Sequence, residues 1–148
     1  MNRLLVVGGG FVGVTLAQVA EAWGAQVAVL DRRRPPVPLP ASINWERADI
    51  GTIDDVSPHL RGHDAVIWCL RPISDPTVVA QLSQRVRLAY ISSLAVYDQK
   101  LGIAREDSAL APQSEYGRLK ATEEATIASS GGLALIVRST GLYGAHLP

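Results

Sequence analysis

The 148-residue sequence has a single cysteine, Cys69, and no excess of charge of either sign. Fourteen basic residues balance fourteen acidic ones, so no net field would attract nucleic acid or an anionic membrane. One cysteine excludes a disulfide within the chain and any metal cluster of cysteine ligands. His59, His63 and His146 are scattered and lack the spacing of metal ligands. We therefore expect a protein of the cytosol without a metal centre, a membrane contact or a nucleic-acid partner.

Long apolar runs are also missing. The N-terminal stretch "MNRLLVVGGGFVGVTLAQVA" starts like a signal peptide, but glycines interrupt it early, and no run reaches the roughly 20 apolar residues that span a bilayer. Proline is concentrated in "RRRPPVPLPA" (32–41), which predicts a surface loop. A length of 148 residues with 47% hydrophobic content suits one domain over residues 1–148.

Short apolar runs alternate with segments of helical spacing along the whole chain. Their continuous apolar character is typical of strands that are buried on both faces of a sheet. The pattern predicts an α/β fold, a doubly wound parallel sheet of about six strands with helices on both faces, in which ligands bind at the carboxyl ends of the strands. The predicted strands are 3–7, 25–31, 43–49, 64–70, 87–93 and 132–138, and the predicted helices are 11–24, 52–62, 75–85 and 114–129.

"GGGFVG" follows the first predicted strand and opens the first predicted helix, with Gly8, Gly10 and Gly13 in the spacing G-x-G-x-x-G. The first glycine permits a tight turn, the second lets backbone approach a pyrophosphate, and the third lets the helix pack closely on the strand. Phe11 and Val12 begin that helix, whose N-terminus offers free N–H groups and positive potential. The motif predicts a dinucleotide-binding turn.

The choice between NAD and NADP depends on the end of the second strand. Asp31 is placed to accept hydrogen bonds from the adenosine ribose of NAD, and its carboxylate would repel a 2′-phosphate. Arg32 opens an arginine run over 32–34 that could instead pair with such a phosphate. We favour NAD, with NADP possible. At the end of the third strand, Asp49 and Ile50 either contact adenine or form the approach to a helix.

Tyr116 and Lys120 stand four residues apart at the start of the helix predicted over 114–129. A free tyrosine titrates near pH 10, so proton transfer at neutral pH needs a cation that stabilises the phenolate. A lysine one helical turn away can supply it, although the same spacing also occurs on solvated helices. Ser93 ends the strand "RLAYISS" at the predicted ligand-binding edge, which favours the functional interpretation.

The motifs "GGGFVG", "VLD", "YISSLAVY", "EDSALAPQSEYGRLKATEE" and "IVRSTGLYG" together resemble the short-chain dehydrogenase/reductase superfamily, in particular the extended and atypical branches that include nucleotide-sugar epimerases and dehydratases. The resemblance implies a Rossmann fold and an NAD(P)-dependent oxidoreductase, epimerase or dehydratase that acts on a hydroxyl or ketone. It further implies that Ser93 hydrogen-bonds the substrate oxygen, that Tyr116 exchanges the proton, and that Lys120 lowers the pKa of Tyr116 and holds the nicotinamide ribose.

The sequence departs from that pattern in three places, one of which is Asp98 in "VYD", where many relatives have "VYG". After the fourth strand, "WCLRP" brings Leu70 and Arg71 where relatives have small residues; Arg71 either contacts the pyrophosphate or is a surface charge. The substrate-binding region expected after residue 144 is largely absent, which indicates a fragment or a minimal relative that closes its site with a partner subunit. We expect exposed apolar surface and a homo-oligomer. The expected substrate is a small molecule, with a nucleotide sugar as one candidate. The alternative function is a non-catalytic dinucleotide-binding or regulatory module, or an inactive truncated fragment.

Overall fold

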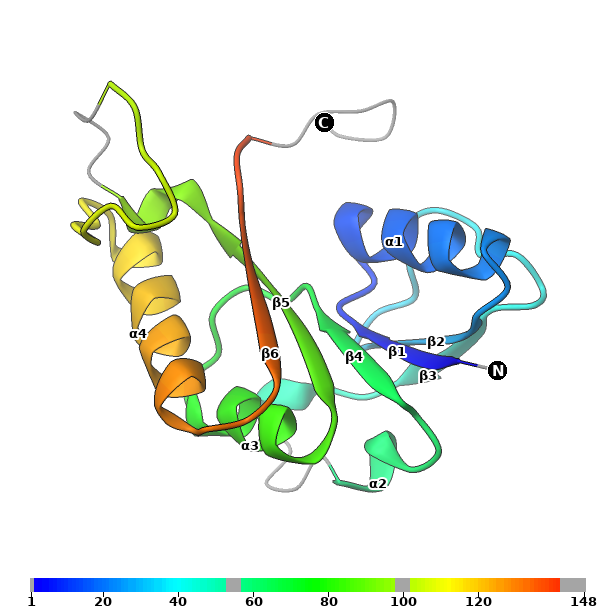
Figure 1. Ribbon diagram of the computed structural model, residues 1–148. Helices are drawn as coiled ribbons and strands as arrows, with labels where there is room; N and C mark the ends of the chain where they lie inside the picture. The colour runs from blue at the N-terminus through cyan, green and yellow to red at the C-terminus, as the bar shows by residue number, and fades with distance from the viewer. Residues whose placement is uncertain (1, 53–56, 98–101, 142–148) are drawn as a thin grey trace.

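The computed structural model describes residues 2–52, 57–97 and 102–141. They form one six-stranded parallel sheet in the order β3-β2-β1-β4-β5-β6, with helices on both faces (Figure 1). The predicted doubly wound α/β fold is confirmed. The strands are β1 Arg3–Val7, β2 Gln26–Asp31, β3 Asn44–Arg47, β4 Ala65–Trp68, β5 Arg87–Ser93 and β6 Ala134–Ser139, and the helices are α1 Phe11–Ala22, α2 Ser57–Leu60, α3 Thr77–Arg85 and α4 Glu115–Ser129. Two short 3₁₀ turns, η1 Ile50–Thr52 and η2 Leu94–Val96, follow β3 and β5.

Two apolar cores lie on the two faces of the sheet. On one face, α1 buries Ala17 against Val6 and Val29, all fully enclosed. On the other face, α3 and α4 cover the larger core, which includes Trp68 of β4 and Ile127 of α4 (Figure 1). The sheet is therefore buried on both sides over its central strands, which is why these strands read as continuous apolar runs.

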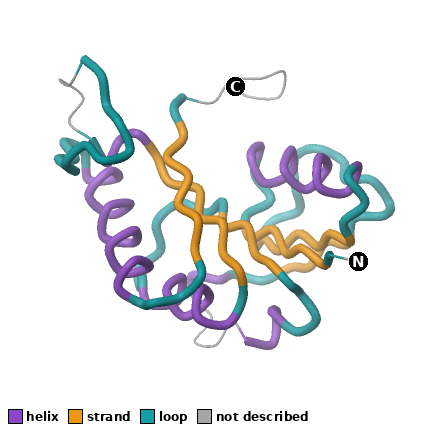
Figure 2. Tube along the Cα trace, in the orientation of Figure 1, coloured by secondary structure: helices purple, strands orange, loops and turns teal. Residues whose placement is uncertain are grey.

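Strand order reverses direction between β1 and β4, which pair in parallel over Leu4–Val7 and Ala65–Trp68. The chain thus builds β1, β2 and β3 outward in one direction and β4, β5 and β6 outward in the other. In such a sheet, ligands bind beyond the carboxyl ends of the strands at this reversal point. Figure 2 shows loops following the strands at that edge.

Edge strand β6 leaves part of one sheet face uncovered. Leu133, Leu135 and Val137 stand 72%, 64% and 39% exposed, respectively, and the last two are on alternate positions of β6. Homo-oligomer formation stays a prediction. Within the described residues, no helix is long and apolar enough to cross a membrane.

Several boundaries differ from those predicted, among them the end of the third strand and the crossover that follows it. The third strand ends at Arg47, so Ala48 and Asp49 leave the sheet. In the crossover predicted over 52–62, the described helix is α2, with Pro58 in its first turn, where a missing N–H costs no hydrogen bond. Asp98 and the region expected to be missing after residue 144 lie outside the described residues.

Candidate functional site

The glycine turn after β1 lies in close contact with the backbone of the first turn of α1. Gly8 has φ +105°, a left-handed conformation that favours glycine, and its N–H donates to Leu30 O at 2.8 Å. A Cβ added to Gly13 would lie 1.8 Å from Gly8 O. The first turn of α1 therefore rests directly on the backbone of the turn, and no side chain fits at position 13.

Gly10 caps the N-terminus of α1 without any side-chain hydrogen bond to the first turn. Its backbone is extended, with φ −73° and ψ −173°, and a Cβ built there meets no atom within 4 Å. The space in front of the helix end is open, and the first-turn N–H groups carry the positive end of the helix dipole. An anionic group can approach the backbone at this point.

A cavity of about 470 Å³ lies beside this helix end. It is bordered by residues that follow β1, β2, β3 and β4, so the strand reversal creates it. Eight of the predicted cofactor-binding residues line it together: Gly8, Gly10, Asp31, Arg32, Asp49, Ile50, Leu70 and Arg71. The predicted residues Phe11, Val12 and Gly13 form the first turn of α1 and are not among the lining residues.

Asp31 uses its carboxylate to fix the glycine turn. Oδ2 accepts the Gly9 N–H at 2.5 Å, and Oδ1 accepts the Arg33 N–H at 3.0 Å. A carboxylate has about four lone-pair positions, so each oxygen keeps capacity for a ligand hydroxyl. Asp31 therefore orients the backbone of the glycine turn and keeps acceptor capacity beside the cavity.

A smaller hollow of about 260 Å³ adjoins the β2 end and is lined by Arg32, Arg33, Arg47 and Asp49. Arg32 and Asp49 border both cavities. Asp49 Oδ1 accepts the Gly51 N–H at 3.1 Å and so also shapes η1, the helix approach that the sequence left as an alternative. Arg47, the last residue of β3, was not considered from the sequence, because its position beside Asp31 follows from the β2–β3 register.

The segment after β4, "CLRPI", forms the opposite wall of the larger cavity. Leu70 comes close to the glycine turn, since a Cβ on Gly8 would lie 3.1 Å from Leu70 Cδ2. Cys69, Pro72 and Ile73 line the cavity as well, and sequence reasoning did not assign them a role. Burial raises the pKa of the Cys69 thiol to about 12, so it is neutral at physiological pH.

Tyr116 lies in the first turn of α4 and is 38% exposed. Burial raises its pKa above the ordinary value, Arg71 lowers it in part, and Glu123 raises it further. Among the groups that shift the pKa of Tyr116, the cation is Arg71. The expectation that Lys120 lowers this pKa stays a prediction.

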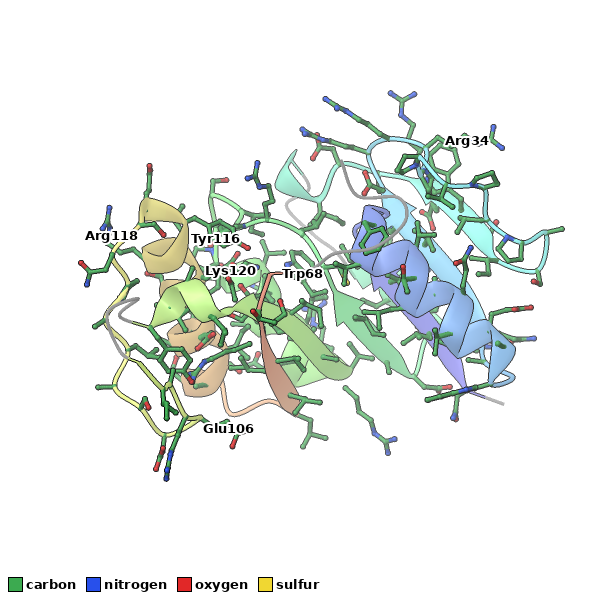
Figure 3. The ribbon with its side chains drawn as sticks, turned by 90° about the horizontal axis from the view of Figure 1, so that it is seen from above. Arg34, Trp68, Glu106, Tyr116, Arg118 and Lys120 are labelled. Carbon is green, nitrogen blue, oxygen red and sulfur yellow. The ribbon has the colours of Figure 1, made fainter. Side chains whose placement is uncertain are left out.

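Lys120 points into the protein and is 1% exposed. Its Nζ donates to Leu70 O at 3.0 Å, Tyr90 Oη at 3.0 Å and Ile91 O at 3.2 Å, so all three of its N–H groups are used. Burial lowers the pKa of Lys120, and Glu123 partly offsets that effect. Figure 3 shows Tyr116 and Lys120 on the inner side of α4, toward Trp68, and Arg118 on the outer side. A cofactor ribose would have to replace one of the three acceptors.

Ser93 ends β5, and its Oγ accepts the Ala95 N–H at 3.2 Å, which caps η2. Its neighbour Ser92 is buried and donates to Glu124 Oε1. Glu124 in turn pairs with Arg138 of β6, with an Nη2 to Oε2 distance of 2.8 Å. Of the two serines at the end of β5, Ser93 therefore lies at the carboxyl edge of the sheet and Ser92 lies inside a polar network.

A buried polar network that the sequence did not reveal centres on Glu123 and Tyr90. Glu123 is 1% exposed and Tyr90 is fully buried. Tyr90 Oη donates to Glu123 Oε2, whose carboxylate also lies 3.6 Å from Lys120 Nζ. The sequence gives one sign of this network, because Glu123 follows Lys120 by three positions on α4. Tyr90 is on β5, so the spacing along the helix does not indicate it.

Among the described residues, no group of three or more His, Cys, Asp or Glu side chains could hold a metal ion.

Comparison with known proteins agrees with this geometry. A family model described as pyridine nucleotide-disulphide oxidoreductase matches residues 3–42, which span β1, the glycine turn, α1 and β2. No curated protein sequence matches the chain.

Solved structures give a wider match. UDP-glucuronic acid 4-epimerase from Bacillus cereus, in complex with NAD, superposes with a TM-score of 0.79 at 23% identity over 96% of this chain. A putative epimerase from Burkholderia cenocepacia J2315 gives 0.79 at 22% over 99%, and dTDP-glucose 4,6-dehydratase from Bacillus anthracis, in complex with NAD, gives 0.75 at 17% over 93%. The chain covers 57%, 56% and 54% of these three proteins, respectively. The likeness establishes a Rossmann fold.

Proposed function

We propose that this chain binds NAD or NADP in the 470 Å³ cavity, as the cofactor-binding part of an oxidoreductase, epimerase or dehydratase of the short-chain superfamily. The observation that carries the proposal is the open approach to the N-terminus of α1. Gly10 leaves room for a ligand at the helix end, whereas Gly8 and Gly13 are needed for the turn itself. Solved structures with the same fold contain NAD.

The cavity residues suit a dinucleotide in their chemistry. The first-turn amides of α1 would bind the pyrophosphate, and Arg71 adds a cation on the facing wall. Asp31 would accept hydrogen bonds from the ribose hydroxyls. Buried Ile50 and the partly buried Ala48 offer apolar contacts for a flat base. The cofactor, when bound, would supply hydride transfer.

NAD is the preferred cofactor in this proposal. The Asp31 carboxylate is fixed at the β2 end by two backbone amides and cannot turn away from a 2′-phosphate without losing both hydrogen bonds. The arginines that line the smaller hollow, Arg32, Arg33 and Arg47, support NADP as the alternative. NAD would contact the carboxylate at the end of β2, whereas NADP would contact the arginines near it. A titration with each cofactor therefore distinguishes the two alternatives.

Catalysis, in the same proposal, would use Ser93 and Tyr116 on a small-molecule substrate. A carbonyl that receives hydride develops negative charge on oxygen, which a serine donor and a tyrosine acid can neutralise. Several similar structures bind nucleotide sugars, such as UDP-glucuronic acid in the epimerase and UDP-glucose in MoeE5, which supports that substrate class. Lys120 would act on the ribose only after exchanging one of its present acceptors.

The second candidate is a non-catalytic dinucleotide-binding module. It is favoured by one observation, the commitment of all three Lys120 N–H groups to protein oxygens. In that case Tyr116 would be a partly exposed helix residue without a catalytic cation, and the cavity would still bind the cofactor.

The first experiment is a titration of the chain with NADH and, separately, NADPH, followed by nicotinamide fluorescence and thermal shift. Gly10→Ala is the matched variant, since its added methyl group meets no protein atom within 4 Å and Gly10 lines the cavity. We expect binding to the wild type and at least ten-fold weaker binding to Gly10→Ala at unchanged melting temperature. Wild-type protein that binds neither cofactor would refute the proposed function. Tyr116→Phe then separates the two candidates, because it removes activity without weakening cofactor binding only if the chain is catalytic.

A further inference from the structure

Glu123 stands outside the cavity but is bonded to its wall. The carboxylate is 1% exposed, and such a group is destabilising unless cations and donors surround it. Its Oε1 accepts the Ile73 N–H at 3.1 Å, and its Oε2 accepts the Tyr90 hydroxyl. The side chain therefore joins α4 to β5 and to the segment that follows β4.

The same segment is held at its other end by Lys120. Lys120 Nζ donates to Leu70 O at 3.0 Å, while the ammonium lies 3.6 Å from Glu123 Oε2. Leu70 and Ile73 are the first and last residues of a four-residue stretch that lines the cavity throughout. One buried ion pair of α4 thus fastens both ends of this stretch.

The stretch Leu70–Ile73 lies beyond the end of β4 and includes Pro72, which has no N–H to donate. Just before this stretch, Cys69 N–H donates to Val7 O at 2.8 Å and so holds the chain to β1. Leu70 faces the glycine turn so closely that a methyl group on Gly8 would contact it. The two hydrogen bonds between α4 and this stretch, at Leu70 O and Ile73 N–H, therefore hold the wall that faces the glycine turn.

We propose that Glu123 is a positioning residue for the cofactor site: through Ile73 N–H and Lys120 it fixes Leu70–Ile73 as one wall of the dinucleotide cavity without touching the ligand. The inference rests on the proposed function, because it assigns the cavity to NAD(P). It also gives Lys120 a role in holding the wall. Acidic Glu123 is needed there for its charge as well as its shape, since a neutral amide would leave the buried Lys120 without its anion.

The test compares Glu123→Gln with Ile127→Val in the 148-residue chain. Ile127 is a core residue of α4 that is 2% exposed and is not among the residues that line the cavity, and shortening it destabilises the same helix. We measure the NADH dissociation constant by fluorescence and the deuterium uptake of the peptide that contains Leu70–Ile73. Glu123→Gln is expected to weaken NADH binding by at least ten-fold and to speed uptake in this peptide, while β1 and β5 stay protected. Ile127→Val is expected to change NADH binding by less than two-fold.

Tyr90→Phe is the second variant and serves if Glu123→Gln does not fold. It removes the hydroxyl that donates to Glu123 and accepts from Lys120 but keeps the ring, and it should weaken NADH binding by about three-fold with faster uptake in the same peptide. Wild-type affinity and uptake in the folded Glu123 or Tyr90 variant would overturn this inference alone. Failure of the wild type to bind either dinucleotide would overturn the proposed function and, with it, this role for Glu123.

Discussion

The β1–β3 side and the β4–β6 side of the sheet bury different kinds of groups. Beside β1 and β2 the enclosed side chains are apolar, such as Val6, Ala17 and Val29, and the proposed ligand-binding features are backbone groups of the glycine turn. Against β5 and β6, α4 buries the ionisable side chains of Lys120, Glu123 and Glu124. A site made of backbone depends on the room that glycine leaves, whereas a site made of buried charges depends on every partner being present.

The largest expected effect is on the side with buried charges. Lys120→Met removes the cation paired with Glu123 and leaves Leu70 O and Ile91 O without their donor. Breaking a buried ion pair by removing one partner costs about 3–5 kcal/mol. Unfolding in urea should show that loss of stability. Arg118→Met on the exposed side of the same helix is the control and should leave the transition midpoint unchanged. Equal midpoints for the two variants would mean that the network contributes no stability.

A glycine substitution tests the side built from backbone. Gly13→Ala places a methyl group 1.8 Å from Gly8 O, so α1 must shift; overpacking of this kind costs roughly 1–3 kcal/mol. Gly117→Ala is the corresponding change on the other side, with a contact of 2.1 Å to Ala95 O. Thermal unfolding should show both variants destabilised and Gly10→Ala unaffected. If Gly13→Ala melts like Gly10→Ala, α1 does not rest on the turn as described.

A smaller effect is expected where the two sides meet, between Arg71 and Tyr116. Burial raises the pKa of Tyr116 and Arg71 opposes this, so Arg71→Gln should move the phenol titration to still higher pH. Because the fold holds this proton more tightly than the unfolded chain, the associated stability is complete below about pH 10 and is lost as the pH rises through the folded pKa. Ultraviolet absorbance of the phenolate measures the titration, with Tyr116→Phe to identify the signal. A shift to lower pH would contradict the prediction.

The smallest perturbation is a chemical label on the single cysteine. With its pKa raised to about 12, the Cys69 thiol is ionised to only about one part in ten thousand at pH 8, so maleimide should react slowly with the native chain. Reaction in urea should be much faster, and NADH should slow the native reaction further, because Cys69 lines the cavity. Mass spectrometry follows the labelling. Native labelling as fast as that in urea would show that the thiol is not enclosed.

The sequence was informative about one side of the molecule and less so about the other. Apolar alternation and glycine spacing predict strands, turns and the cavity edge, because these patterns follow from local geometry. The spacing of Tyr116 and Lys120 predicts that both lie on one helix face, and Figure 3 shows both on the inner side of α4. It could not reveal that Lys120, one turn further from the helix start, reaches oxygens on the β4 and β5 sides that are 29 to 50 positions away in sequence.

The strand order also has a kinetic consequence. Residues 3–47 contain β1, β2 and β3, and residues 65–139 contain β4, β5 and β6, so the two groups of strands are continuous stretches of chain. They are joined in the sheet by the pairing of β1 with β4, where Arg3 N–H donates to Asp64 Oδ2 across 61 positions of sequence. Closing a loop of that length is entropically unfavourable until both strands are ordered. We expect the pairing of β1 with β4 to form late in folding and to be the slow step. Residues of both stretches line the cavity, so the cavity is complete only after this pairing has formed.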